Sequence, residues 1–254
     1  MTPAATASPW LRRPKPRPGA ALRLVCVPHA GAGPSSFARW IAELAPDVEV
    51  CIAALPGRES RFTEPPVTDV DVLADELTAA TAGLGADLPV ALFGHSMGAV
   101  LAYEVAHRLP TPPAHLVASG SLPPQVPDLD PRIAHLPDAE FLARVRAYGG
   151  IPDAVCADPD LLALLLPVLR ADFAACEGYR FTERPPLDCP VTALCGSGDR
   201  YVDEAALGRW GELTTGECVT RVIGAGHFNL VEDRAAVLGF LRARLGVTAE
   251  GAQP

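Results

Sequence analysis

Short apolar segments alternate with amphipathic stretches along most of this chain, and this alternation constrains its fold more than any other feature. Segments with the length and character of buried strands are residues 22–28, 48–55, 89–93, 115–120, 190–195 and 218–223. Helices are expected at residues 35–45, 69–83, 97–109, 204–213 and 233–245, where apolar residues recur at helical spacing. Ser35 is the expected N-cap of the first helix. Because strands that alternate with helices form parallel sheets, we expect an α/β fold with a mostly parallel central sheet and helices on both faces.

The segment at about 123–188 interrupts this alternation. It opens with a Pro-rich stretch and continues with two helical patterns, at 138–148 and 158–176, without a convincing strand. Insertions of this kind lie over the carboxyl edge of the sheet, where α/β proteins bind their ligands. The expected organisation is an irregular Pro- and Arg-rich arm at 1–20, a single domain at 21–246 with this insertion, and a flexible tail at 247–254.

Composition excludes several classes of partner. The chain has 21 basic and 30 acidic side chains and a formal net charge of −9, which argues against nucleic acid or an anionic membrane as the main partner. Its longest apolar run, at 161–169, is far shorter than the ~18 residues of a membrane span. The seven cysteines include no C-x-x-C pair, which favours free, mostly buried thiols in a cytoplasmic protein. No cluster has metal-ligand spacing, so we expect neither a metal nor an organic cofactor.

The sequence GHSMG at 94–98 fits the pattern G-x-S-x-G. An apolar strand ends at Phe93 and a helical pattern begins at about Met97, which is the strand–turn–helix setting that this motif requires. The tight turn predicts a strained backbone at the serine, and the two glycines leave room for the neighbouring strand and helix. We therefore expect Ser96 to be a nucleophile exposed at the N-terminus of a helix.

A serine nucleophile needs a base, and His227 is the best candidate among six histidines. It follows the last expected strand, so it lies at the carboxyl edge of the sheet. Asp199 follows the preceding strand and is expected to orient His227, whereas Asp203 is the alternative and is better suited to cap the helix that starts at Glu204. The order serine, aspartate, histidine along the chain is that of α/β-hydrolases. The other histidines are less suited: His29 shapes its loop, His95 points away from the nucleophile, His107 and His115 are structural or exposed, and His135 lies in the insertion.

Acyl transfer also requires an oxyanion hole. One donor is expected to be the backbone N–H of Met97, the residue after the nucleophile. The second is expected from the Gly-rich sequence HAGAG at 29–33, which follows the first main strand, with Ala30 as the donor.

With these residues in place, the chain resembles the type II thioesterases of modular polyketide synthases and nonribosomal peptide synthetases. The resemblance covers roughly Trp10 to Leu245. Its motifs are WLRR at 10–13, VPHAG at 27–31, LPGRESR at 55–61, GHSMGA at 94–99, FL at 141–142, GG at 149–150, LRADF at 169–173 and GHF at 226–228. The PGRE-type segment and LRADF are the most specific of these. The chain departs from the family pattern at HAGAG, where HAGG is usual, and at Asn229, where a second aromatic residue is frequent.

The resemblance implies an α/β-hydrolase fold with a mobile helical lid at about 123–188. It implies a substrate acyl group on the phosphopantetheine arm of an acyl or peptidyl carrier protein, so that the arm arrives with the substrate. The family removes stalled or wrong acyl groups from synthases. We expect a monomer. Six arginines could help to dock an acidic carrier, although scattered arginines are more often simple solvated surface. They are Arg58, Arg61, Arg144, Arg146, Arg180 and Arg184.

Two other functions remain open on the sequence alone. A general serine carboxylesterase or acyltransferase that acts on free small-molecule esters would share the nucleophile, the base and the fold, because a fold does not determine a function. A non-catalytic scaffold that binds carrier proteins would share the fold only.

Overall fold

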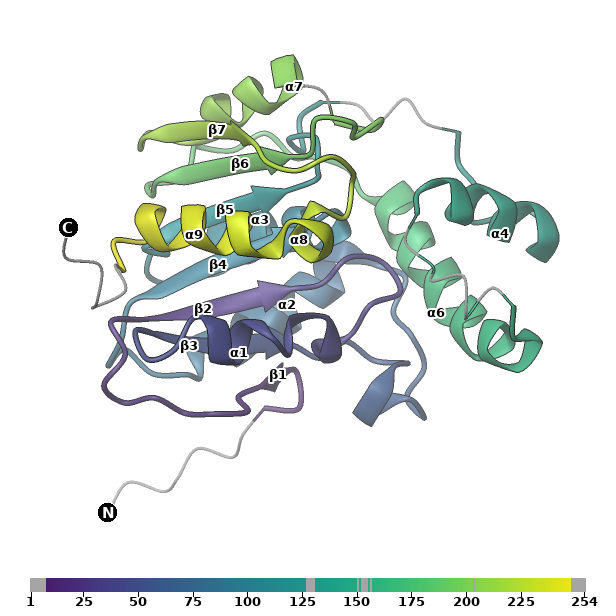
Figure 1. Cartoon of the computed structure of the whole chain (residues 1–254), viewed down its shortest axis with the longest axis horizontal. Helices are drawn as coiled ribbons and strands as arrows, with labels where there is room; N and C mark the ends of the chain where they lie inside the picture. Colours follow the sequence, from purple (N-terminus) through teal and green to yellow (C-terminus); the bar gives the residue numbers. More distant parts are fainter. Residues whose placement is uncertain are drawn as a thin grey trace.

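Seven strands form a single sheet within the part of the chain that the computed structural model describes, which is residues 8–126, 131–149, 151, 155, 157–202 and 204–247 (Figure 1). The strands are β1 Leu11–Arg12, β2 Leu22–Val27, β3 Val48–Ala53, β4 Val90–His95, β5 His115–Ser119, β6 Val191–Cys195 and β7 Cys218–Val222. Their order across the sheet is β1-β3-β2-β4-β5-β6-β7, with β1 antiparallel to β3 and the remaining neighbours parallel. The predicted mostly parallel sheet is therefore confirmed.

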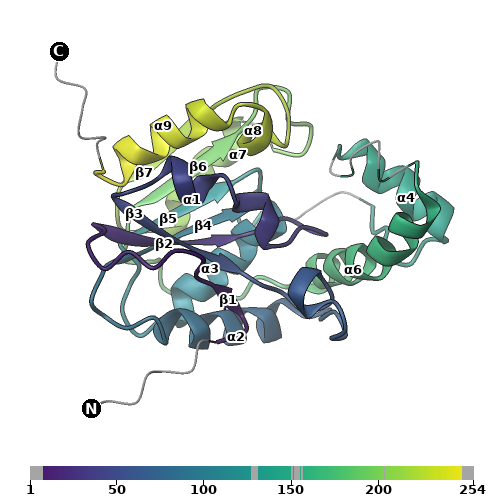
Figure 2. The ribbon, with the colours of Figure 1, turned by 60° about the horizontal axis from the view of Figure 1, so that its bottom comes forward.

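Helices cover both faces of the sheet (Figures 1 and 2). The helical segments are η1 Pro34–Phe37, α1 Trp40–Glu43, η2 Glu59–Arg61, α2 Val70–Ala82, α3 Met97–Arg108, α4 Asp138–Ala147, α6 Pro159–Gly178, α7 Glu204–Gly208, η3 Arg209–Leu213, α8 Asn229–Glu232 and α9 Arg234–Arg244. One hydrophobic cluster joins the sheet to α2, α3 and α7, and a second joins it to α1, α8 and α9. Every residue of β2, β3, β5 and β6 is buried, as expected for strands with both faces covered.

The insertion forms a separate helical layer beside the carboxyl ends of the strands (Figures 1 and 2). Its helices α4 and α6 share a small core of their own, built from Ile133, Phe141, Val145, Ile151 and Leu169. The sheet and most of the insertion therefore have distinct hydrophobic cores. No helix in the described ranges is long and apolar enough to cross a membrane.

Several local predictions are wrong. The predicted helix at 35–45 is divided into η1 and α1, and Ser35 does not cap it; its hydroxyl instead donates a hydrogen bond of 2.7 Å to Glu59 Oε1. Part of the segment expected to be an irregular arm forms β1, which extends the sheet beyond β3. Helix α8, immediately after the GHF motif, has no counterpart among the predicted elements.

Some predictions fall on residues outside the described part, namely those for Asp203, Cys156, most of the expected tail and the first seven residues of the arm. Among the described cysteines, Cys26, Cys51 and Cys189 are buried free thiols and Cys218 is a half-buried one, while Cys195 is buried and Cys176 is exposed.

Candidate active site

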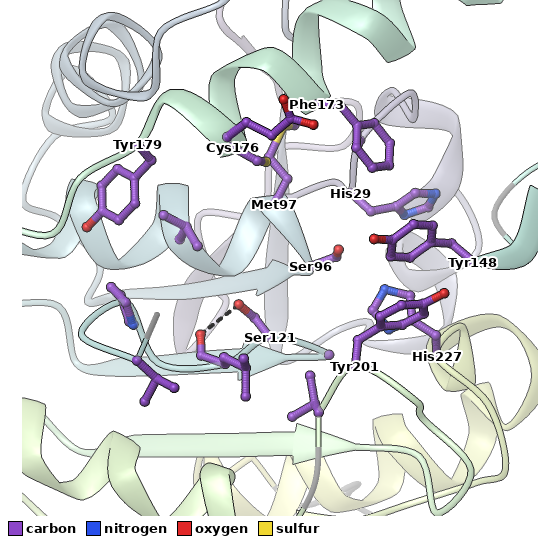
Figure 3. A pocket seen from close by; sticks show the side chains of 18 of the residues that line it. His29, Ser96, Met97, Ser121, Tyr148, Phe173, Cys176, Tyr179, Tyr201 and His227 are labelled. Atoms are coloured by element: carbon purple, nitrogen blue, oxygen red, sulfur yellow. Dashed lines mark hydrogen bonds between the residues drawn. The ribbon is translucent and has the colours of Figure 1, made fainter. Parts of the chain in front are cut away.

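Ser96 lies in the turn between β4 and α3 with φ 54° and ψ −120°, a backbone conformation that residues other than glycine rarely adopt. The two motif glycines permit this turn. A Cβ at Gly94 would lie 2.0 Å from the Gly98 carbonyl oxygen, and a Cβ at Gly98 would lie 2.2 Å from the Val27 carbonyl oxygen. The tight approach of β4, α3 and β2 therefore requires glycine at both positions. It leaves the Ser96 side chain on the wall of a cavity (Figure 3).

The loops after β6 and β7 run side by side and bring two predicted residues together. The Ser197 N–H donates to the Gly224 carbonyl at 2.9 Å, and the Gly198 N–H donates to the Ala225 carbonyl at 2.6 Å. These bonds continue the pairing of β6 with β7 beyond the strands. As a result, Asp199 and His227 emerge from adjacent loops at the carboxyl edge of the sheet.

His227 and Asp199 are hydrogen bonded, with 2.8 Å between His227 Nδ1 and Asp199 Oδ2. The Asp199 side chain is fully buried and that of His227 is 8% exposed. The second carboxylate oxygen of Asp199 accepts the Tyr201 N–H at 3.0 Å. An ionised carboxylate at Nδ1 favours the tautomer with the proton on that nitrogen, which leaves Nε2 as the proton acceptor.

Ser96 and His227 line the same cavity, and Figure 3 shows the serine hydroxyl turned toward the side that holds His227. No hydrogen bond joins these two side chains, both of which lie in the described part. Hydrogen bonds of this kind are often loose in ligand-free enzymes and tighten when substrate binds.

Aromatic rings enclose His227. The His95 ring lies 5.0 Å from it and the Phe228 ring also 5.0 Å, while His29 packs edge-on against Phe228 at 4.9 Å. Burial and the neighbouring His227 lower the pKa of His29 to about 4 and hold that of His95 well below its usual value. Both histidines therefore stay neutral near pH 7. His95, expected to point away from the nucleophile, is fully buried with Nδ1 3.1 Å from the Ser119 hydroxyl.

The two residues predicted to supply oxyanion donors also line this cavity. Met97 is the first residue of α3, where backbone N–H groups have no partner within the helix. Ala30 lies in the loop after β2, next to Gly31, whose φ is +80°. Both loops border Ser96 at the carboxyl edge of the sheet, so the structure brings the segments that carry Met97 and Ala30 to this serine.

The cavity has a volume of about 810 Å³, and its walls come from both the sheet edge and the insertion. This is within the range of small-molecule sites. Apolar side chains form much of the lining, including Val100, Leu122, Val145, Leu169 and Phe173. On one side, the Tyr148 ring after α4 stacks on Tyr201 with 4.0 Å between ring centroids, and Tyr201 in turn contacts His227 edge-on at 5.8 Å. The insertion therefore meets the loop that carries Asp199.

The six arginines considered for carrier docking, with plain solvated surface as the alternative, differ in their exposure. Arg58 and Arg61 are only 7% and 8% exposed, so neither offers a docking surface. Arg184 is half-buried in an ion pair with Glu104. Arg144, Arg146 and Arg180 are exposed, and Arg180 borders the cavity together with two further exposed arginines, Arg132 and Arg200.

Sequence reasoning also missed the aromatic residues around the site. Tyr148 and Tyr201 are far apart in the chain and carry no local pattern. Phe228 is part of GHF, and its position after the expected base was the available signal. Within the described ranges, no group of three or more His, Cys, Asp or Glu side chains is arranged to hold a metal ion.

Comparison with known proteins shows the family to which this chain belongs. The family model described as "Thioesterase domain" matches residues 22–245. The chain is 34% identical to the gramicidin S biosynthesis protein GrsT of Aneurinibacillus migulanus, over 96% of this chain and 97% of that protein. It is 39% identical to thioesterase PikA5 of Streptomyces venezuelae, over 87% of this chain and 80% of that protein.

A solved structure gives the same result. The type II thioesterase BorB from the borrelidin biosynthetic cluster matches with a TM-score of 0.85 and 35% identity, covering 94% of this chain and 99% of that one. Together with the strand order, this match confirms the expected α/β-hydrolase fold.

Proposed function

This chain belongs to the thioesterase family, among the type II thioesterases of polyketide and nonribosomal peptide pathways, and on that basis we propose that Ser96, His227 and Asp199 hydrolyse acyl groups held as thioesters on carrier proteins. The observation that carries the proposal is the 2.8 Å bond between His227 Nδ1 and the buried Asp199 carboxylate, on the wall of the cavity that Ser96 lines. A strained serine, an oriented imidazole and two donor-bearing loops at one site suit acyl transfer.

In the acylation step, Ser96 Oγ attacks the thioester carbonyl carbon while His227 Nε2 takes the hydroxyl proton. Asp199 keeps the imidazole in the required tautomer and stabilises the cation that forms. The N–H groups of Met97 and Ala30 stabilise the negative oxygen of the tetrahedral intermediate. When this intermediate collapses, the carbon–sulfur bond breaks and the protonated His227 gives its proton to the departing phosphopantetheine sulfur, which leaves as the thiol and restores the neutral base. The departure is easy because thiols ionise near pH ~8.5.

In the deacylation step, His227 removes a proton from water and the resulting hydroxide attacks the acyl-Ser96 ester. Collapse of the second tetrahedral intermediate releases the carboxylic acid and returns the proton from His227 to Ser96. The sum is thioester plus water giving acid plus thiol. No step needs a metal or an organic cofactor, because the phosphopantetheine arm is part of the substrate.

Carrier-bound acyl groups are favoured over free esters by two considerations. The relatives are named for gramicidin S biosynthesis and for the borrelidin cluster, and we infer a comparable setting for this chain, with removal of stalled acyl groups as its role. The cavity, of about 810 Å³, has apolar walls for an acyl chain and exposed arginines at its border, where the phosphate of an entering arm and an acidic carrier would carry negative charge.

The proposal is tested by comparing kcat/KM for one short acyl group presented on a phosphopantetheinylated carrier protein, on free pantetheine and as a simple ester. We expect the carrier-bound thioester to be cleaved fastest, with no cleavage above background by Ser96→Ala. Equal or faster cleavage of the free ester would favour a general serine esterase. Failure of Ser96 to react with a fluorophosphonate would favour a non-catalytic scaffold.

A further inference from the structure

Three motifs that are far apart in the sequence meet at one buried ion pair. Arg58, from the PGRE-type segment, contacts Asp172, from the LRADF segment in α6, through two hydrogen bonds of 2.7 and 2.8 Å. The Asp172 side chain is fully buried and that of Arg58 is 6% exposed. The same carboxylate accepts the backbone N–H of Gly31, in the loop after β2, at 2.7 Å. None of these groups has a step in the proposed mechanism.

The ion pair holds the Gly31 loop from both sides. Asp172 Oδ2 accepts the Gly31 N–H at 2.7 Å, and Arg58 Nη1 donates to the Ala32 carbonyl at 3.1 Å. Arg58 is itself oriented by a 3.2 Å bond from its Nε to the Pro56 carbonyl. The two bonds to the loop determine the orientation of the peptide groups immediately after Ala30.

Helix α6 also packs directly on this loop. A Cβ at Gly31 would lie 2.4 Å from a methyl carbon of Leu169, and Gly31 has a φ of +80°. Leu169 and Phe173 at the same time line the cavity. One helix of the insertion therefore supports the loop that carries Ala30 and forms part of the wall that would contact the acyl chain.

We propose that Asp172, held by Arg58, is a positioning residue for the oxyanion hole. By fixing the Gly31 peptide group, Asp172 directs the Ala30 N–H at the developing oxyanion. The second donor is therefore in place only while α6 packs on the loop. This inference rests on the proposed function, in which Ala30 supplies a donor to the thioester oxygen. It assigns to α6 a role in catalysis besides that of covering the cavity.

The test separates positioning from mere stabilisation. Asp172→Ala removes the acceptor of the Gly31 N–H. Glu49→Gln is the control, because Glu49, in β3, is another fully buried carboxylate and is paired with Arg13 and Arg23. Each variant is assayed for thermal unfolding, for kcat and KM on an acyl-pantetheine thioester, and for the Ki of an acyl trifluoromethyl ketone. Ser96 adds to the carbonyl of this ketone to form a tetrahedral oxyanion, which requires the same donors as the transition state.

We expect Asp172→Ala to lower kcat by about 10–100-fold, less than the loss of an entire donor, with KM within about threefold of wild type. The Ki of the ketone should rise by the same factor as kcat/KM falls. The pH dependence of kcat/KM should keep its shape, since His227 and Asp199 are untouched. Glu49→Gln should unfold more easily without a change in kcat or Ki. Values of kcat and Ki for Asp172→Ala within threefold of wild type would overturn the inference.

Two further arms keep the result interpretable. If Asp172→Ala does not fold, Asp172→Leu removes the acceptor of the Gly31 N–H while filling the space of the carboxylate and carries the same test, where kcat and Ki both within threefold of wild type would overturn the inference. If wild type cleaves no thioester, the proposed function fails and the ketone Ki still compares the variants. If wild type is active and Asp172→Ala matches it, the inference alone fails.

Discussion

The ring of Tyr148 stacks on the ring of Tyr201 with 4.0 Å between their centroids and 17° between their planes. Tyr148 directly follows α4 in the insertion, and Tyr201 lies two residues after Asp199. This contact closes one side of the cavity, just as the bonds of Asp172 hold the other helix of the insertion, α6, to the loop after β2. The insertion is thus joined to the carboxyl edge of the sheet through a stacked aromatic pair beside α4 and a buried ion pair on α6.

Removing the stacked pair should make α4 open more readily. Aromatic stacking contributes about 0.5–1.5 kcal/mol beyond area burial, so Tyr148→Ala should raise the population of the open insertion by roughly 2–10-fold. Hydrogen exchange of the α4 amides should accelerate by the same factor. Tyr148→Phe keeps the ring and serves as the control. Unchanged exchange in Tyr148→Ala would show that the contact does not hold the insertion closed.

Alanine should have opposite effects at a glycine of the Ser96 turn and at a glycine in an exposed part of a helix. Gly98→Ala should prevent folding or lower Tm strongly, because its Cβ would lie 2.2 Å from the Val27 carbonyl oxygen. Gly239→Ala is the control, since Gly239 is in α9 and a Cβ there meets nothing within 4 Å. It should stabilise the protein by about 1 kcal/mol through helix propensity. Thermal unfolding of both variants measures the contrast, and a Gly98→Ala protein with wild-type Tm would contradict this account of the turn.

Two aspartates distinguish the partner of His227. Asp199→Asn should lower kcat by about 10³–10⁴-fold, because an amide no longer favours the imidazole tautomer with its acceptor toward Ser96. Asp203→Asn, at the position that the sequence leaves as the alternative, should keep kcat within a few-fold of wild type. Steady-state kinetics on an acyl-pantetheine substrate settles the choice. A larger loss in Asp203→Asn than in Asp199→Asn would reverse the assignment.

Buried histidines should make folding stability sensitive to mild acid. His115 is 5% exposed, with Nε2 2.8 Å from the Thr192 hydroxyl, and burial lowers its pKa to about 4. The unfolded chain takes up this proton below pH ~6.5 while the folded protein does not, so the free energy of unfolding falls as the pH drops from 7 to 5. His115→Gln should reduce that fall by about 2 kcal/mol.

Urea unfolding of wild type and His115→Gln at pH 7 and pH 5 checks this prediction. Carboxylates with lowered pKa values, such as Glu49 and Glu104, lose their contribution only at lower pH, so the two effects are separable. An identical pH dependence in the two proteins would show that His115 does not take part.

Features that depend on local spacing could be predicted from the sequence. The elbow at Ser96 follows from a strand, two glycines and a helix within a short segment. The approach of Asp199 to His227 follows from topology, since both come directly after neighbouring parallel strands. The positions of Ala30 and Met97 on the cavity wall follow in the same way, from loops at the same edge of the sheet.

Features that depend on long-range packing could not be predicted from the sequence. Arg58 and Asp172 are 114 residues apart, and an arginine that follows a proline and a glycine is predicted to be exposed as long as its partner is unknown. Tyr148 and Tyr201 belong to different layers, and nothing near either residue indicates the other. Strand β1 is two residues long and is defined by its pairing with β3, so its own sequence carries no strand signal. Ser35 matched a capping pattern, but its hydroxyl donates a hydrogen bond to the Glu59 carboxylate instead.

The most direct test of the account is release of free acid from an acylated carrier protein by wild type and by Ser96→Ala, followed in parallel by mass spectrometry of the carrier. We predict that wild type converts acyl-carrier to free carrier thiol, and that Ser96→Ala is slower by at least about 10³-fold. Ser96→Ala activity within tenfold of wild type would contradict the assignment of Ser96 as the nucleophile.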